Sequence, residues 1–114
     1  MPVRGQRVAT LERAPVFVRG IRLGEVENVL LDEDASRILG LEVYCGDGSS
    51  RFLPYATARA THAGLEVAST LTLLDGRELD FYRRRGRTFA SVPELADAVV
   101  GPEGTLIVPL EARC

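Results

Sequence analysis

Two stretches decide the fold that this sequence predicts: LGEVENVLLD at residues 23–32 and ILGLEV at residues 38–43. In both, apolar side chains alternate with polar side chains or glycine, which is the period of a β-strand that buries one face. The segment between them, Asp32-Glu-Asp-Ala-Ser36, carries the Asp and Ser side chains that favour turns. The two stretches therefore predict a pair of antiparallel strands joined by an acidic turn.

The first of these strands is expected to bend. Over residues 16–31 the apolar alternation changes phase near Asn28, because Val26 falls on one face while Val29 and Leu31 fall on the other. A β-bulge, one extra residue in the strand, would absorb this slip and bend the strand as small barrels require. The pattern therefore predicts a bulge close to Asn28.

Further short strands are predicted before residue 75, near residues 51–55, 57–62 and 65–69. Pro54 has no backbone N–H to donate, so it must lie at a sheet edge or a strand end. Leu71 and Leu73 are expected to continue the apolar face. Because turns recur about every ten residues and no helical periodicity precedes residue 75, the fold class is mainly β, an antiparallel barrel or sandwich.

The C-terminal part, about residues 75–110, predicts one or two short helices and a final hairpin. Asp75 with Glu78 three positions on is an N-cap pattern, and Gly86 is a stop signal, so a helix is expected between them. Ser91-Val-Pro-Glu94 repeats the capping pattern and predicts a second helical turn. The hairpin is expected at Val99-Val100, the turn 101–104 and Leu106-Ile-Val108. We treat residues 1–114 as a single domain.

The composition narrows the classes of function. All fourteen cationic residues are arginine, which excludes chemistry that uses a lysine as Schiff base or general base. A net charge of −2 predicts no general attraction to nucleic acid or to an anionic membrane. Cys45 lies in a predicted strand and Cys114 ends the chain, so we do not expect them to pair, and this usage fits a reducing compartment. The longest apolar run, Leu106–Leu110, is too short to span a membrane. We therefore expect a cytoplasmic protein without membrane insertion.

Arginines crowd the end of the predicted helix, at Arg83, Arg84, Arg85 and Arg87. They could bind phosphate groups of RNA or a carboxylate patch on a partner. They could instead be structural, because cations at a helix C-terminus interact favourably with its dipole and Asp80 can pair with Arg83 or Arg84. The neighbouring aromatic residues are expected to pack the helix against the barrel rather than stack on bases; they are Phe81, Tyr82 and Phe89.

The acidic turn partly imitates a calcium-binding loop. Asp32, Asp34 and Ser36 match its first ligands, but Arg37 occupies the position that needs glycine and Val43 the position that needs a bidentate glutamate. We therefore expect a solvated turn and no metal site.

Neither His62 nor Cys45 fits a catalytic pattern. His62, the single histidine, has no metal-ligand spacing around it, and no serine lies in a nucleophile motif. Cys45 is followed closely by Asp47, which would not lower the pKa of a thiol, so it is expected to be a small apolar filler. The sequence predicts no catalytic residue and no cofactor.

The opening hairpin is similar to a known family. GEVENVLLD, the short turn, ILGLEV and the following RFLP resemble the PRC-barrel family, whose domain occurs in the cytoplasmic part of the photosynthetic reaction centre H subunit and at the C-terminus of the ribosome maturation factor RimM. The likeness covers about residues 15–75. It implies a small, partly open antiparallel β-barrel that docks onto other macromolecules and has no catalytic residues. It also suggests a proton relay, for which carboxylates such as Glu25, Glu27 and Glu42 would have to lie close to His62.

Our leading hypothesis is a non-enzymatic interaction module that docks onto a protein or ribonucleoprotein partner. Self-association is expected through an exposed strand edge or through the helical extension. The alternative is an RNA-binding or ribosome-assembly factor that uses the arginine cluster, with affinity that falls steeply as salt rises. An enzyme would require a concave polar pocket with perturbed carboxylates.

Overall fold

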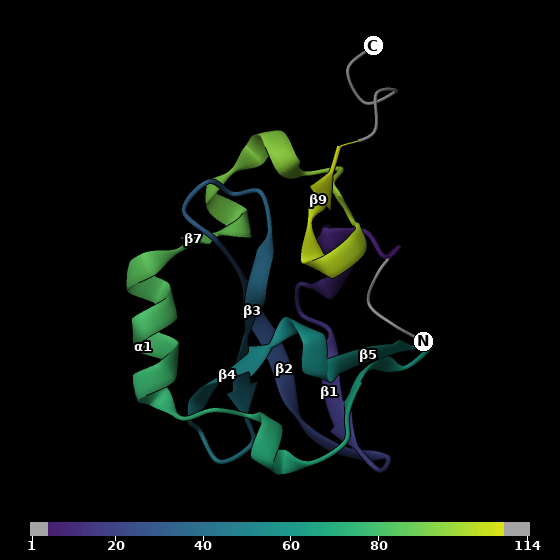
Figure 1. Cartoon of the computed structure of the whole chain (residues 1–114). Helices are drawn as coiled ribbons and strands as arrows, with labels where there is room; N and C mark the ends of the chain where they lie inside the picture. The colour runs from purple at the N-terminus through teal and green to yellow at the C-terminus, as the bar shows by residue number, and fades with distance from the viewer. Residues whose placement is uncertain (1–4, 109–114) are drawn as a thin grey trace.

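The computed structural model describes residues 5–108 of the chain, and its main element is one curled, open sheet (Figure 1). Its strands are β1 (Pro15–Val18), β2 (Ile21–Leu31), β3 (Ile38–Cys45), β4 (Ser50–Pro54), β5 (Ala58–Thr61), β6 (Gly64–Val67) and β7 (Arg87–Thr88). They follow the order β4-β3-β2-β1-β6-β5, and β7 pairs with the far end of β2. The pairs are antiparallel except β1 with β6, which is parallel. The fold is therefore mainly β, a half-barrel left open between β4 and β5.

β2 and β3 form the hairpin predicted from the opening stretches, and the predicted bulge is confirmed. The register between the two strands shifts between Val26 and Asn28. Both Val26 and Val29 consequently lie in the apolar core inside the barrel, whereas Leu30 belongs to a second cluster on the outer face of the sheet. The bulge thus lets one strand supply apolar side chains to both faces.

The stretch 16–31, treated in the sequence as one strand that bends, is two strands with a tight turn between them. β1 and β2 pair antiparallel around Arg19 and Gly20, which both have positive φ. A two-residue hairpin turn of this kind favours residues such as Asn-Gly, because both positions must adopt the left-handed conformation. Because Arg19 occupies the position where Asn is usual, the sequence does not indicate this turn.

Helix α1 (Gly76–Arg85) covers part of the outer face of the sheet. Its predicted start and end are confirmed, because the Asp75 carboxylate accepts hydrogen bonds from the N–H groups of Arg77 and Glu78 and the helix stops before Gly86. Leu79 packs into the second apolar cluster with Leu30 and Phe52 of the sheet. Burial of this cluster holds α1 along β4 (Figure 1).

The predicted final hairpin is present as β8 (Val99–Val100) and β9 (Leu106–Ile107), which form a small separate sheet. The Val100 N–H donates to the carbonyl of Gln6, and the Leu106 N–H donates to the carbonyl of Ser36. The hairpin therefore joins the N-terminal segment to the β2–β3 turn. It is β7, and not this hairpin, that extends the barrel sheet.

Two predictions in the later half of the chain need correction. Leu71 does not continue an apolar strand face: it lies in a single 3-10 turn, Thr70–Thr72, and its side chain is 86% exposed, whereas Leu73 is buried. The Ser69 hydroxyl accepts a hydrogen bond from the Leu71 N–H, and this cap turns the chain out of the extended form. Ser91 does not cap a helix, because its hydroxyl donates to the carbonyl of Thr88. The short 3-10 turn Pro93–Leu95 follows it in place of an α-helix.

Candidate interaction surfaces

Glu42, in the middle of β3, is a buried charge with 2% of its surface exposed. Its neighbours in sequence, Leu41 and Val43, fill the inside of the barrel, so the Glu42 side chain lies on the outer face, beneath α1. A carboxylate removed from water is unstable unless charged and hydrogen-bonding partners surround it. The partners of Glu42 come from α1 and β2.

Arg83 of α1 is the main partner of Glu42. Its Nε donates to Glu42 Oε1 at 3.2 Å, and its Nη2 donates to Oε2. Asn28 on β2 donates from Nδ2 to the same Oε1 at 3.1 Å, and the predicted partner Asp80 lies 3.5 Å from Arg83 Nη1. The hydrogen bond to Glu42 is the main cause that raises the pKa of Arg83 above its usual value. Arg83 therefore joins the helix to the sheet by a two-pronged ion pair.

The other three arginines of the cluster, Arg84, Arg85 and Arg87, are exposed. The guanidinium carbon of Arg85 lies 4.8 Å from the centre of the Phe81 ring, a cation–π contact. Arg85 also shares a shallow hollow with the acidic residues of the β2–β3 turn, Asp32, Glu33 and Asp34. Negative charge beside Arg85 weakens its attraction for an anion, and Arg84 and Arg87 are not in that hollow.

The aromatic residues near the cluster divide between packing and exposure. Tyr82 stacks on Phe52 of β4 with ring centres 4.1 Å apart, and Phe89 is buried in the core of the barrel. Tyr82 confirms the prediction that these residues pack the helix against the barrel, whereas Phe89 lies beyond the helix and packs the turn Phe89–Ser91 against the barrel. Phe81 contradicts it, because its ring is 42% exposed and contacts Tyr82 edge-on. Phe81 faces outward because the opposite side of the helix carries the packing residues Leu79 and Tyr82.

The carboxylate of Asp32 accepts hydrogen bonds from backbone groups of its own turn. It accepts hydrogen bonds from the N–H of Ser36 at 2.9 Å and of Arg37 at 3.3 Å. Across residues 5–108, no cluster of three or more His, Cys, Asp or Glu side chains is arranged to hold a metal ion. Asp32 thus acts as the hydrogen-bond acceptor that shapes the hairpin turn.

Cys45 is buried as a free thiol, as the prediction of an apolar filler requires. Burial, followed by the charge of Asp47, raises the pKa of this thiol above its usual value. The thiol therefore stays protonated, which makes it a poor nucleophile. Cys114, the other cysteine, lies outside the described residues.

His62 lies exposed in the turn between β5 and β6. No hydrogen bond or ion pair within the described part of the chain joins it to Glu25, Glu27 or Glu42. Glu42 instead pairs with Arg83, and Glu27 accepts a hydrogen bond from the Ser50 hydroxyl at 3.4 Å. The groups named for a proton relay are thus held in separate interactions.

Comparison with known proteins supports the fold described above. A family model described as PRC-barrel domain matches residues 6–70, which include β1 to β6. No curated protein matches the chain. Within residues 5–108, no helix is long and apolar enough to cross a membrane. Since the matched region contains every strand of the half-barrel except β7 and spans more than half of the chain, the protein belongs to the PRC-barrel domain family.

Proposed function

We propose that this chain is a non-catalytic cytoplasmic module that docks onto a protein or ribonucleoprotein partner and associates with itself. PRC-barrel domains mediate protein interactions. The observation that carries the self-association is the unequal state of the two sheet edges. At one edge, the β4 residue Phe52 exchanges backbone hydrogen bonds with Leu74, at 3.0 and 2.8 Å. At the other edge, β5 pairs with β6 alone among the described strands.

An open strand edge offers a row of backbone donors and acceptors to a second strand. The side chains of β5 suit such pairing, because Ala58 and Ala60 point into the barrel while Arg59 and Thr61 are exposed. Two copies that join antiparallel through β5 would form one continuous sheet with twofold symmetry. We propose this pairing as the self-association interface.

Ala60 offers a way to test the edge without breaking the barrel. Thr61 and Gly64 are the outer residues of the turn between β5 and β6, so the hydrogen bond of that turn joins them. Opposed residues of an antiparallel pair alternate between bonded and non-bonded positions. The N–H of Ala60 is therefore expected to face away from β6, toward the open edge.

Ala60→Pro is expected to weaken the dimer by about tenfold or more, because proline removes that outward donor and places its ring at the interface. Sedimentation equilibrium measures the dimer dissociation constant. Ala60→Gly is the matched control, since it also changes the buried side chain at this position but keeps the N–H, and it should dimerise. A wild-type chain that stays monomeric would contradict self-association, and an Ala60→Pro chain that dimerises normally would exclude this edge.

The exposed arginines support a second candidate function, in which the chain binds RNA as an assembly factor. The double variant Arg84→Glu with Arg85→Glu should then lose RNA affinity and much of its salt dependence, because both guanidinium groups would contact phosphates. Filter binding with ribosomal RNA at several salt concentrations measures this. Arg13→Glu with Arg19→Glu makes the same change of charge at two exposed positions outside the cluster. Equal RNA affinity in the two double variants would remove the arginine cluster from consideration.

A further inference from the structure

The backbone groups that β5 can offer to a second strand belong to its two alanines, Ala58 and Ala60. Arg59 and Thr61 direct their N–H and carbonyl groups toward β6, because Thr61 closes the β5–β6 turn and bonded positions alternate along a strand. The two alanines direct these groups outward. The Ala58 N–H, however, already donates to the carbonyl of Tyr55 in the preceding 3-10 turn. Ala60 therefore offers a donor and an acceptor, whereas Ala58 offers only an acceptor.

Two antiparallel registers connect two copies through these groups. In the first, Ala60 lies opposite Ala60 of the second copy, and each N–H donates to the carbonyl of the other. In the second, Ala60 lies opposite Ala58 of the second copy and donates to its carbonyl, but the Ala58 N–H cannot return the bond because it is held by Tyr55. By symmetry, both registers form the same number of backbone hydrogen bonds. Backbone bonding therefore does not choose between them.

The exposed side chains of β5 do distinguish the two registers. In the second register, Arg59 lies directly opposite Arg59 of the second copy, at a non-bonded position where the Cα atoms are about 4.5 Å apart. Like charges directly opposite each other destabilise a strand pair. In the first register, Arg59 lies opposite Thr61 of the second copy, and the two arginines are diagonal neighbours at about 7–8 Å. Charge therefore favours the first register.

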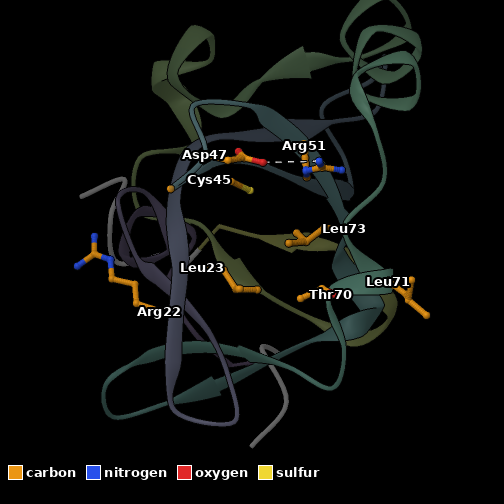
Figure 2. A pocket seen from close by; sticks show the side chains of 9 residues that line it. Arg22, Leu23, Cys45, Asp47, Arg51, Thr70, Leu71 and Leu73 are labelled. Atoms are coloured by element: carbon orange, nitrogen blue, oxygen red, sulfur yellow. Dashed lines mark ion pairs between the residues drawn. The ribbon is translucent and has the colours of Figure 1, made fainter.

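Arg59 has no ion-pair partner within its own copy among residues 5–108. Arg51 provides the contrast, because it lies 3.9 Å from the Asp47 carboxylate of the same copy, as the dashed line in Figure 2 marks. Glu66 lies opposite Arg59 on β6, but the two side chains do not form such a pair. The charge of Arg59 therefore acts on the residue that lies across the open edge.

We infer that two copies pair antiparallel about Ala60, with Arg59 of each copy opposite Thr61 of the other. This inference rests on the proposed self-association and adds the residues that meet at the interface. Ala60 lies on the twofold axis and supplies the backbone hydrogen bonds, and Arg59 excludes the competing register. The outer face of the joined sheet then carries an Arg59–Thr61 pair on each side of the axis.

NMR of the wild-type chain determines the register directly. A dimer prepared from equal amounts of carbon-13-labelled and unlabelled chain gives nuclear Overhauser effects between copies in an isotope-filtered experiment. The α-protons of residues at opposed non-bonded positions face each other across two antiparallel strands. We expect an effect between the α-protons of Arg59 in one copy and Thr61 in the other. An effect between the two Arg59 α-protons would overturn the inference.

Variants of Thr61 test the role of charge while Arg59 is kept. Thr61→Glu should tighten the dimer about tenfold and Thr61→Arg should weaken it about tenfold, because each pair with Arg59 occurs twice by symmetry. Thr61→Gln is the matched control, since it also removes the hydroxyl that accepts from the Ala63 N–H but adds no charge. The chain has a net charge of −2, so overall repulsion alone would give the reverse order. Equal dissociation constants for the two charged variants, or that reverse order, would overturn the inference.

Failure of this inference can be told apart from failure of the proposed function. A wild-type chain that stays monomeric in sedimentation equilibrium would reject self-association and this register with it. A wild-type chain that dimerises, but in which Arg59 meets Arg59 of the second copy, would retain self-association and reject only the pairing about Ala60.

Discussion

Replacing Arg83 by leucine is expected to lower the free energy of unfolding by about 3 kcal/mol, although 44% of the Arg83 side chain is exposed. The loss arises at its partner. Glu42 is 2% exposed, and without Arg83 its carboxylate keeps, among residues 5–108, only the hydrogen bond from Asn28. We expect the lower end of the range for a broken buried pair, because solvent reaches the arginine side and screens the interaction. Urea denaturation followed by circular dichroism measures the change.

Two further variants separate charge from packing. Arg84→Leu removes an exposed arginine from the same helix turn and should change stability by less than about 0.5 kcal/mol. Glu42→Leu in the Arg83→Leu background should restore much of the lost stability, because it replaces an unpaired buried carboxylate by an apolar side chain. If Arg83→Leu were no more destabilising than Arg84→Leu, the ion pair would not hold the helix to the sheet.

Gly24→Ala is expected to destabilise the protein by about 3 kcal/mol or more, through a different cause. A Cβ atom on Gly24 would lie 2.0 Å from the carbonyl oxygen of Tyr44 and 2.9 Å from Cys45 Cα. Both atoms belong to the backbone of β3, so relief requires the two strands to separate rather than a side chain to rotate. Thermal and urea denaturation should both show the loss.

Gly76→Ala is the control for that substitution. A Cβ on Gly76, the first residue of α1, meets no atom within 4 Å. Alanine favours a helix over glycine by up to about 1 kcal/mol, so this variant should be unchanged or slightly more stable. Equal stability of the Gly24→Ala and Gly76→Ala variants would mean that β2 and β3 do not approach as closely as described.

The parts of the fold that sequence predicts well are local. The β2–β3 hairpin follows from alternation, the bulge from a change of phase, and α1 from Asp75 and Gly86 at its two ends. The parallel pairing of β1 with β6 could not be predicted in this way, since it joins residues far apart in the chain. Short-range patterns do not determine which distant strands become neighbours.

The same limit explains what the sequence showed of the candidate sites. Asp80 was recognisable as a partner of Arg83 because helical residues three positions apart are neighbours. Glu42 was not, because it lies 41 residues from Arg83 and occupies a polar position of an alternating strand, where an exposed side chain is expected. The exposure of Leu71 was missed because Leu71 was assigned to a strand, although Ser69 before Thr70 and Leu71 is a recognisable signal for a turn.

If the proposed self-association through sheet edges holds, the hydrogen bonds between Phe52 and Leu74 would limit the size of the assembly. A sheet with two open edges can add copies without end and grow into a fibre. Here the β4 edge is capped at Phe52 from within the chain, so among the described strands of the barrel sheet the open edge is β5. When two copies join through their β5 edges, neither copy keeps an open edge of the barrel sheet for a third copy. Association through β5 would therefore stop at the dimer, because the segment at Leu74 blocks the addition of another copy at the β4 edge.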